Sequence, residues 1–294
     1  MADFTFPATA NVVVQQGAKP VLIDIILDSY TIAPDKLEEK ITKRTKAIIP
    51  VHAFGQSADM DPIMDIAKKH GLFVIEDAAC ALGTTYKGRK CGGIGDVGCF
   101  SFHPRKAITT GEGGMVVTNI KEVAEKAKTL RNHGGVFDGL FYRFEFAGFN
   151  YRMTEIQALM GLSQINKIEA IIERRILLAK MYEKKLKGLP GIMTPIIKDW
   201  GRHVFQSYVV LLEDGIDRDK IVLFTRHNGV ETTLGTYALH PQPFFMQNYG
   251  YKKGELINSY KAYKQALTLP LFSDITEDDM DLVVEMISKG TRAQ

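Results

Sequence analysis

The sequence predicts an α/β protein built on a mostly parallel sheet. Three runs of apolar and β-branched residues, typical of buried strands, lie at 21–25, 46–51 and 72–75. Helical patterns at 34–41 and 59–70 separate these runs from one another. Such an alternation of strand and helix predicts parallel strands that are joined by right-handed crossover connections.

The segments on either side continue this α/β pattern. Residues 8–17 predict a short helix that Gly17 closes, with Pro20 beyond it as a stop. Further along the chain we predict strands at 97–102 and 115–118, and a helix at 123–130. The next stretch, 136–151, is rich in Phe, Tyr and Gly and has no regular period.

The C-terminal part of the chain has a different pattern. A long helical pattern at 154–186 is expected to lead into a second domain. A predicted strand and two predicted helices follow, at 207–212, 219–228 and 257–266. We therefore predict a large α/β domain at 1–178 and a smaller α+β domain at 179–294.

The composition is typical of a globular enzyme. The chain has 294 residues, of which 45% are hydrophobic, so it can bury a large core. Its 37 basic and 34 acidic residues give a net charge of +3, which argues against nucleic-acid binding. No apolar run is long enough to span a membrane, and no signal-like segment opens the chain, so we expect a cytoplasmic protein.

Two spacings argue against other kinds of site. The three cysteines, Cys80, Cys91 and Cys99, fit no C-x-x-C metal motif, and their odd number argues against a disulfide framework. We therefore predict no metal site. The glycine-rich stretch 88–95 lacks the G-x-G-x-x-G spacing of dinucleotide-binding proteins and is interpreted as a turn.

A lysine and a carboxylate stand at the ends of two predicted core strands. Lys106 follows the strand at 97–102 and precedes a glycine-rich turn, where a partly desolvated amine can attack a carbonyl and form a Schiff base. Asp77 lies just beyond the strand at 72–75, at the edge where open α/β sheets bind ligands. Each residue also has a plainer interpretation, as a surface lysine or as a helix N-cap. Together they are the pair that pyridoxal phosphate enzymes need.

Several motifs in the same order resemble one known family. They are E-D-A-A, F-S-F-x-x-x-K-x-x-T-T-G-E-G-G-M, R-N-H-G and G-F-N-Y-R-M-T-E-I-Q-A. From Phe4 almost to its C-terminus, the chain resembles the DegT/DnrJ/StrS family of pyridoxal phosphate-dependent nucleotide-sugar aminotransferases. The resemblance implies an aspartate aminotransferase-like fold (fold type I). It also implies that the family's opening section, with a Gly-Thr/Ser turn for the cofactor phosphate, has no counterpart before Phe4.

The resemblance further implies contacts to pyridoxal 5'-phosphate. Phe6 would stack on the pyridine ring, Ser101 would bind the phosphate, and Asn150 or Arg152 would reach the phosphate of a neighbouring subunit, so a homodimer is expected. Cys80 stands where the family commonly has Gln or His against the ring hydroxyl, and a thiol is a weaker donor. From the residues alone, Phe6 could equally be a core aromatic, and Ser101 more often bonds to backbone. Arg152 could equally form an intrachain ion pair.

Three histidines are candidate substrate contacts. His52 follows the strand at 46–51 and is expected to face the same cleft, with a satisfied loop histidine as the equal alternative. His203, in R-H-V-F-Q-S-Y, is similar in position to a family histidine near the cleft. His240, in H-P-Q-P, resembles part of the family's substrate-side loop.

The reaction that the resemblance implies is transamination in two half-reactions. Glutamate is the expected amino donor and a keto sugar nucleotide the acceptor, with Lys106 moving the proton as general base and acid. One rival is the family's sugar dehydratase branch, in which a histidine replaces the lysine; Lys106 is present here, although His103 lies nearby. The other rival is a non-catalytic or regulatory protein that keeps the fold.

Overall fold

The structure is a computed structural model that describes residues 1–292. Its central sheet has four strands in the order β4-β5-β8-β9. Strands β4 (Ala47–Ile48), β5 (Phe73–Asp77) and β8 (Val97–Ser101) are parallel, and β9 (Gly114–Val117) runs antiparallel to β8. The predicted α/β class with a mostly parallel sheet is confirmed.

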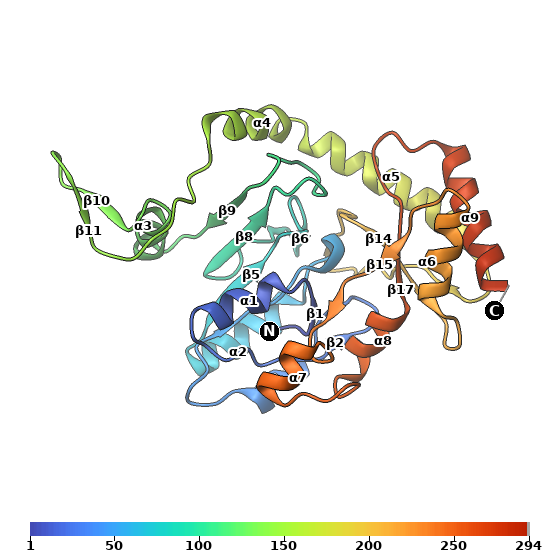
Figure 1. The fold of residues 1–294 in the computed structure, drawn as a ribbon, viewed down its shortest axis with the longest axis horizontal. Helices are drawn as coiled ribbons and strands as arrows, with labels where there is room; N and C mark the ends of the chain where they lie inside the picture. The colour runs from blue at the N-terminus through green and yellow to red at the C-terminus, as the bar shows by residue number, and fades with distance from the viewer. Residues whose placement is uncertain (293–294) are drawn as a thin grey trace.

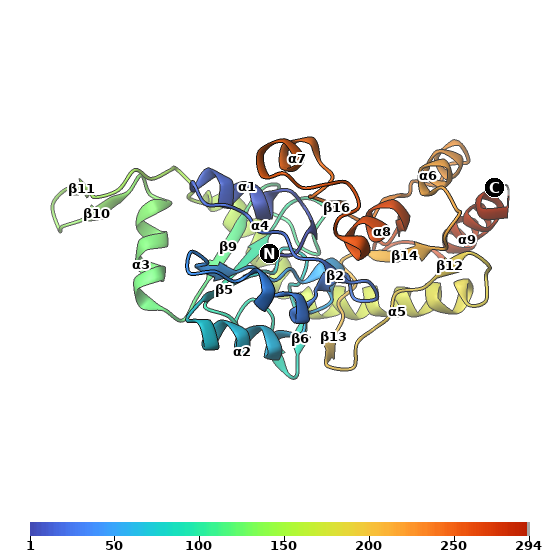
Figure 2. The ribbon, with the colours of Figure 1, turned by 90° about the horizontal axis from the view of Figure 1, so that it is seen from below.

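Helices lie on both faces of this sheet, with α1 (Ala8–Gln15) on one side and α2 (Met60–His70) on the other (Figure 2). The buried residues of α2 recur at helical spacing, because they face the sheet: Met60, Ile63 and Ala67. The helix ends at Gly71, whose φ of 61° is a left-handed conformation that glycine adopts without strain. The helix predicted at 59–70 is therefore confirmed.

The strand predicted at 21–25 is only partly formed. Ala2 and Ile23 make a parallel bridge, and β2 (Ile25–Ile26) then pairs with β3 (Thr31–Ile32) in a hairpin. This segment therefore makes short pairings on two sides instead of one continuous strand.

The helix predicted at 34–41 is not a continuous α-helix. The segment forms two short 3-10 helices, η1 (Pro34–Lys36) and η2 (Glu38–Lys40). Leu37 is the buried residue between them, so the segment has no continuous apolar face that would stabilise an α-helix.

The N-terminal residues pair with a segment from the last third of the chain. Strand β1 (Phe4–Thr5) is antiparallel to β16 (Tyr237–Ala238). The helices α7 (Pro243–Tyr249) and α8 (Ile257–Gln265) follow β16, and α7 joins a core cluster with the start of the chain. The buried members of this cluster are Met1, Ala10, Leu22, Leu239 and Phe245.

A second sheet belongs to the C-terminal half. It is antiparallel in the order β12-β14-β17-β15, which are Ile192–Met193, Tyr208–Leu212, Ala266–Leu269 and Thr233–Leu234. Its core includes residues of α5 (Ile168–Leu186), α6 (Arg218–His227) and α9 (Glu277–Arg292), among them Tyr182, Ile221 and Ile287. The domain boundary between 178 and 179 stays a prediction. Residues from both sides of it, such as Ala10 and Phe245, pack in the same core cluster at the start of the chain.

The long helix predicted at 154–186 is two helices. Helix α4 (Glu155–Ile165) begins in a capping box of Thr154 and Gln157 and ends at Asn166. Helix α5 then starts at Ile168 and carries the chain to the second sheet (Figure 1). No residue of α4 is buried, whereas α5 buries six, so the packing of the two helices differs sharply.

An arm projects from the body at the left of Figure 1. It consists of α3 (Lys121–Leu130), a hairpin of β10 (Gly135–Phe137) with β11 (Tyr142–Phe144), and the segment that follows to Arg152, which pairs back on the end of α3. The stretch without period at 136–151 therefore contains a hairpin. Its large apolar side chains are exposed: Phe137, Leu140, Phe141, Tyr142 and Phe144.

A small antiparallel sheet in the order β13-β6-β7 completes the fold, with strands Gly201–Arg202, Thr85–Tyr86 and Arg89–Lys90. A short 3-10 segment, η3 (Ala53–Gly55), follows β4. Among the described residues, none of the helices has the length and apolar character needed to cross a membrane.

Candidate active site

Lys106 lies in the loop between β8 and β9. Its backbone N–H donates to the carbonyl of His103 at 2.9 Å, which closes a turn after the strand. Its half-buried side chain reaches back over the sheet, and Nζ lies 3.1 Å from Sγ of Cys80. The lysine is therefore held at the end of the sheet and is not a free surface side chain.

Asp77 is the last residue of β5, and both of its carboxylate oxygens are engaged. Oδ1 accepts the N–H of Ala79 at 3.1 Å, and Oδ2 accepts the hydroxyl of Thr9 at 2.7 Å. The first bond closes a turn, and no helix follows, so the plainer interpretation of Asp77 as a helix N-cap does not hold. The second bond comes from helix α1, so two segments fix the orientation of the carboxylate.

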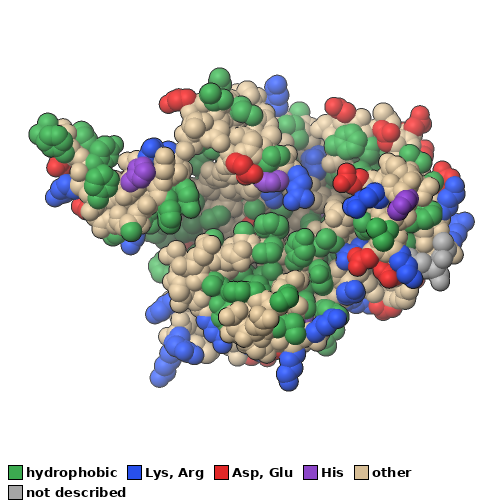
Figure 3. Space-filling view, in the orientation of Figure 1, with side chains coloured by type: hydrophobic (Ala, Val, Ile, Leu, Met, Phe, Trp, Pro, Cys, Tyr) green, Lys and Arg blue, Asp and Glu red, His purple; other side chains and the backbone are tan. Residues whose placement is uncertain are grey.

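The amine reaches the turn that follows the carboxylate. Asp77 and Cys80 belong to the same turn after β5, and Lys106 bonds to Cys80 from the neighbouring strand's loop. The two strands pair in parallel, with Asp77 opposite Cys99, so their carboxyl ends lie together. The surface seen in Figure 3 is hollowed below α4, over the region of β8 and β9.

Phe6 and Ser101 lie on the segments that border this turn. Phe6 is 59% exposed at the start of α1, and its carbonyl accepts the N–H of Thr9, the residue that holds Asp77. Ser101 ends β8, and its Oγ accepts the N–H of His103 at 3.3 Å. Phe6 is therefore not a core aromatic, while Ser101 does bond to backbone.

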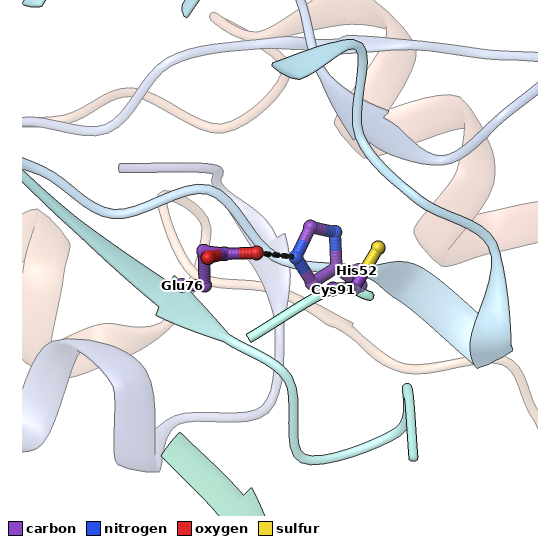
Figure 4. A group of neighbouring side chains, drawn as sticks. All are labelled: His52, Glu76 and Cys91. Atoms are coloured by element: carbon purple, nitrogen blue, oxygen red, sulfur yellow. Dashed lines mark hydrogen bonds and ion pairs between the residues drawn. The ribbon is translucent and has the colours of Figure 1, made fainter. Parts of the chain in front are cut away.

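His52 is fully buried at the carboxyl end of β4 and bonds to Glu76. Its Nε2 lies 2.8 Å from Oε2 of Glu76, and its Nδ1 accepts the N–H of Ala58 at 3.1 Å (Figure 4). Since Nδ1 accepts, Nε2 carries the proton and donates it to Glu76. Both ring nitrogens are used, so His52 matches the alternative of a satisfied histidine better than a substrate contact.

Glu76 is the buried carboxylate behind this bond. Besides His52, the backbone N–H groups of Gly92, Ile94 and Gly95 donate to it at 2.6 to 2.7 Å. Although burial acts to raise it, these bonds and the His52 partner hold the pKa of Glu76 below its usual value. The residue fastens the turn at 92–95 to strand β5.

Cys91 lies beside His52 and Glu76, and the ligand atoms of the three side chains are within 4.8 Å of one another. Such a group could in principle hold a metal ion. The Cys91 sulfur, however, points away from the bond between the other two (Figure 4), whose polar atoms already have protein partners. We therefore interpret the cluster as structural.

The other two predicted substrate histidines are also buried. His203 stacks on Phe205 with ring centroids 4.0 Å apart, and burial lowers its pKa to about 3. His240 is fully buried, and its Nδ1 lies 2.6 Å from Oδ2 of Asp3. These contacts are within the protein and give no support to a substrate role for either ring.

Asn150 and Arg152 lie on the arm, away from the segment of Lys106. Asn150 pairs with Asn132 just beyond the end of α3, and Arg152 Nη1 donates to Oδ1 of the same Asn132 at 2.5 Å. Arg152 and Arg131 line a groove beside α3. The structure does not bring these residues to Lys106 within one chain, and Arg152 bonds an amide, not a carboxylate.

Two residues of the site were not singled out from the sequence, Thr9 and Gln206. Thr9 holds Asp77, and Gln206 bonds to the backbone on both sides of Lys106. A threonine near a helix start and a glutamine near a strand start both have ordinary local interpretations. Only their contacts across 68 and about a hundred residues of chain distinguish them.

The side chains at this turn fit the cofactor predicted from the sequence. Lys106 offers an amine to an aldehyde, and Asp77 offers a carboxylate that two donors hold in one orientation. The glycines after Lys106 keep the loop tight, since a Cβ on Gly113 would lie 2.3 Å from Oγ1 of Thr110. An amine, an oriented carboxylate and a narrow loop together fit an aldehyde-bearing pyridine ring.

Comparisons with known proteins identify the family. The model of the DegT/DnrJ/EryC1/StrS aminotransferase family matches residues 1–288. GDP-perosamine synthase of Caulobacter vibrioides is 40% identical over 290 residues, which are 98% of this chain and 77% of that protein.

Solved structures are similar over almost the whole chain. Helicobacter pylori PseC, an aminotransferase involved in the biosynthesis of pseudoaminic acid, matches with a TM-score of 0.94 and 28% identity, over 100% of this chain and 79% of that one. A DegT DnrJ EryC1 StrS aminotransferase of Brucella abortus matches with a TM-score of 0.89 and 31% identity, over 99% and 78%.

Proposed function

Because this chain belongs to the DegT/DnrJ/EryC1/StrS aminotransferase family, we propose that it transfers an amino group from glutamate to the keto group of a sugar nucleotide. Its fold is that of the fold type I pyridoxal phosphate-dependent transferases, and its cofactor is pyridoxal 5'-phosphate. The amino donor, the keto sugar, a cytoplasmic location and the individual site residues are parts of the proposal.

The observation that carries the proposal is the meeting of Lys106 with the turn that begins at Asp77. In the proposed site, Lys106 would hold the cofactor through Nζ and Asp77 would bond its ring nitrogen. Phe6 would cover a face of the ring and Ser101 would contribute to phosphate binding, with Cys80 beside Nζ. When bound, the cofactor supplies an electron sink for the carbon that loses its proton.

The reaction needs two tasks from the residues of this chain. Asp77 keeps a proton on the ring nitrogen, and the hydroxyl of Thr9 keeps Asp77 turned toward it. Lys106 would carry the proton that moves during transamination on its Nζ, acting as general base and then general acid. The amine is half-buried, in the loop between β8 and β9.

The proposal includes a homodimer. Asn150 and Arg152 lie on the projecting arm, and the arm exposes a row of large apolar side chains (Figure 3). Contiguous exposed apolar surface favours burial against another chain. In the proposed dimer the arm of one subunit brings Asn150 and Arg152 to the cofactor phosphate of the other.

A spectroscopic titration tests the proposal. Purified protein with pyridoxal 5'-phosphate should show the absorbance band of the amine-bound cofactor, and glutamate should shift it. Lys106→Ala should abolish the band, whereas Lys121→Ala, which removes an exposed lysine of α3, should keep it. A band that survives Lys106→Ala contradicts the role of Lys106, and no response to glutamate contradicts the donor. A chain that binds no cofactor supports the rival non-catalytic function.

A further inference from the structure

The side-chain amide of Gln206 spans the backbone on both sides of Lys106. Its Oε1 accepts the N–H of Ala107 at 3.0 Å, and its Nε2 donates to the carbonyl of Arg105 at 2.6 Å. Both ends of one amide are therefore used on the two peptide groups that flank the lysine. A rotation of the Lys106 backbone would break at least one of these bonds, so Gln206 fixes the point from which the lysine side chain starts.

The backbone of Gln206 is itself held by an arginine from helix α5. Arg175 Nε donates to the carbonyl of Phe205 at 2.8 Å, and Nη2 donates to the carbonyl of Gln206 at 2.6 Å. The guanidinium group is planar and rigid, so two bonds from one fork leave the peptide little freedom. Arg175 is buried, with 9% of its surface exposed, and buried hydrogen bonds of a charged donor are strong.

The turn that carries Gln206 has a strained backbone conformation. Phe205 has a φ of 48°, in the left-handed region that a bulky residue rarely adopts. Its N–H donates to Nδ1 of His203 at 2.9 Å, and the N–H of Val204 donates to the carbonyl of Gly55 at 3.0 Å. A Cβ on Gly55 would lie 2.9 Å from the backbone nitrogen of Gln206. Strain of this kind persists only where the surroundings fix it, and it concentrates at functional sites.

We propose that Gln206 is a positioning residue for Lys106, and that Arg175 acts through it. The inference rests on the proposed function, because positioning matters only if Lys106 holds the cofactor. Strand β14 begins at Tyr208, two residues after Gln206, and α5 packs on the same sheet. The network therefore makes the placement of the lysine depend on how the C-terminal sheet sits against the loop after β8.

The chain offers a matched control for Gln206. Gln164 on α4 makes the same two-ended contact with Thr109 in the same loop, accepting its N–H at 3.1 Å and donating to its carbonyl at 2.7 Å. Gln206→Met and Gln164→Met therefore remove the same kind and number of bonds to this loop, and Gln164→Met also removes a bond to the carbonyl of Met160 in its own helix. Only the first pair of bonds flanks the lysine.

The test measures the chemistry of Lys106 directly. Cofactor-free protein is incubated with pyridoxal 5'-phosphate over a series of pH values, reduced with borohydride, and digested for peptide mass spectrometry at Lys106. We expect Gln206→Met to slow the labelling of Lys106 about tenfold and to shift its pH midpoint, since a small misplacement of a reacting group has effects of this size. Gln164→Met should label within about twofold of wild type, by the same reasoning.

A second variant tests whether Arg175 acts on Lys106 by holding Gln206. Arg175→Lys removes the planar fork, and thermal unfolding shows whether this variant folds. Added to Gln206→Met, it should slow labelling no further, because the two residues act in one chain of contacts. If the double variant is labelled more slowly than Gln206→Met alone, Arg175 does not act through Gln206.

Three results would each contradict a different claim: the positioning role of Gln206, its specificity, or the proposed function. If Gln206→Met labels at the rate and pH midpoint of wild type, the positioning role is wrong and the proposed function stands. If Gln164→Met loses as much as Gln206→Met, the effect is a general loosening of the loop, and the specific role of Gln206 is wrong. If wild-type protein is not labelled at Lys106 at all, the proposed function fails, and the positioning role fails with it.

Discussion

Thr9 Oγ1 donates a 2.7 Å hydrogen bond to Oδ2 of Asp77, so helix α1 orients the carboxylate that ends strand β5. A hydroxyl has one proton, and at this distance it goes to the carboxylate. The contact of 2.9 Å between Thr9 and Thr5 is then a bond in which Thr5 donates. The first strand, the first helix and Asp77 are thus joined in one chain of hydrogen bonds.

This bond predicts the effect of Thr9→Val. The variant keeps the shape of the side chain but removes the donor to Oδ2 of Asp77, while Oδ1 keeps the N–H of Ala79. Since hydrogen bonds to charged groups contribute about 1.5 to 3 kcal/mol, we expect the dissociation constant for pyridoxal 5'-phosphate to rise about tenfold or more. Fluorescence titration measures the constant, and Thr9→Ser, which keeps the hydroxyl, should bind within about threefold of wild type. Equal affinity of the valine variant would show that Thr9 does not serve Asp77.

The contact between Cys80 and Lys106 predicts a protection experiment. Because Cys80 is half-buried beside Nζ, iodoacetamide should alkylate it in cofactor-free protein, and the added group should block covalent attachment of the cofactor to Lys106. Cofactor bound beforehand should slow the alkylation of Cys80 severalfold. Peptide mass spectrometry follows each cysteine, and Cys99, which is also half-buried, reports general changes in exposure. If bound cofactor leaves the rate of Cys80 alkylation unchanged, the thiol lies outside the site.

The sequence predicted most accurately the helices and strands that depend on apolar periodicity and local end signals. Helix α2 was predicted to within one residue, because its apolar spacing and Gly71 are local features. The helix predicted at 34–41 forms only as two short 3-10 helices, because one buried leucine cannot stabilise a continuous α-helix. The break at Asn166 between α4 and α5 was missed, because helical patterns on its two sides run together in the sequence.

The sequence could not predict side-chain partners that are distant in the chain. His240 bonds to Asp3, 237 residues away, and His52 bonds to Glu76 across two strands. Such histidines look like exposed loop residues until the fold supplies their acceptors. Lys106 and Asp77 could be singled out because each follows a predicted core strand, and the carboxyl ends of parallel strands lie at one edge.

Replacement of Glu76 should destabilise the protein in a pH-dependent way. Glu76→Gln keeps the size of the side chain but turns an amide N–H2 toward backbone donors, and we expect a loss of about 3 kcal/mol at neutral pH. Because its pKa in the folded state is below the usual 4.5, its contribution is complete above that pH and is lost as the pH falls below it. Urea unfolding across this range measures both effects.

The control for Glu76 is Glu122→Gln, which changes an exposed residue of α3 and should leave stability almost unchanged. If Glu76→Gln instead shows the same acid slope as wild type, the carboxylate is not the group that responds. Full stability of Glu76→Gln at neutral pH would contradict its role in fastening the turn at 92–95.

His203 should lower stability in mild acid. Burial lowers its pKa from 6.5 to about 3, so the unfolded chain takes up a proton below pH 6.5 while the folded protein does not. The free energy of unfolding should therefore fall by about 1.4 kcal/mol per pH unit between these values. His203→Asn keeps an acceptor for the N–H of Phe205 and should remove this slope, whereas His227→Asn, on the surface of α6, should retain it. Urea unfolding at several pH values compares the three proteins.

The arm supplies the test of the proposed dimer. Asn150 pairs with Asn132 on the arm, and Lys106 lies in the loop after β8. If one active site takes Lys106 from one subunit and Asn150 from the other, a defect in either residue can be complemented by the partner. Complementation between inactive variants separates this arrangement from one in which each chain forms its own site.

We therefore predict that mixing two inactive variants restores activity. Lys106→Ala and Asn150→Ala should each be almost inactive alone. After random exchange at equal amounts, half of the dimers are mixed, and each has one site with an intact Lys106 and an intact Asn150, so about a quarter of the wild-type sites should return. Aminotransferase assays measure the recovery, and a mixture of Lys106→Ala with Asp77→Ala should recover nothing, because both residues belong to the same subunit's half of the site. Recovery at the level of that control would mean that Asn150 serves its own chain.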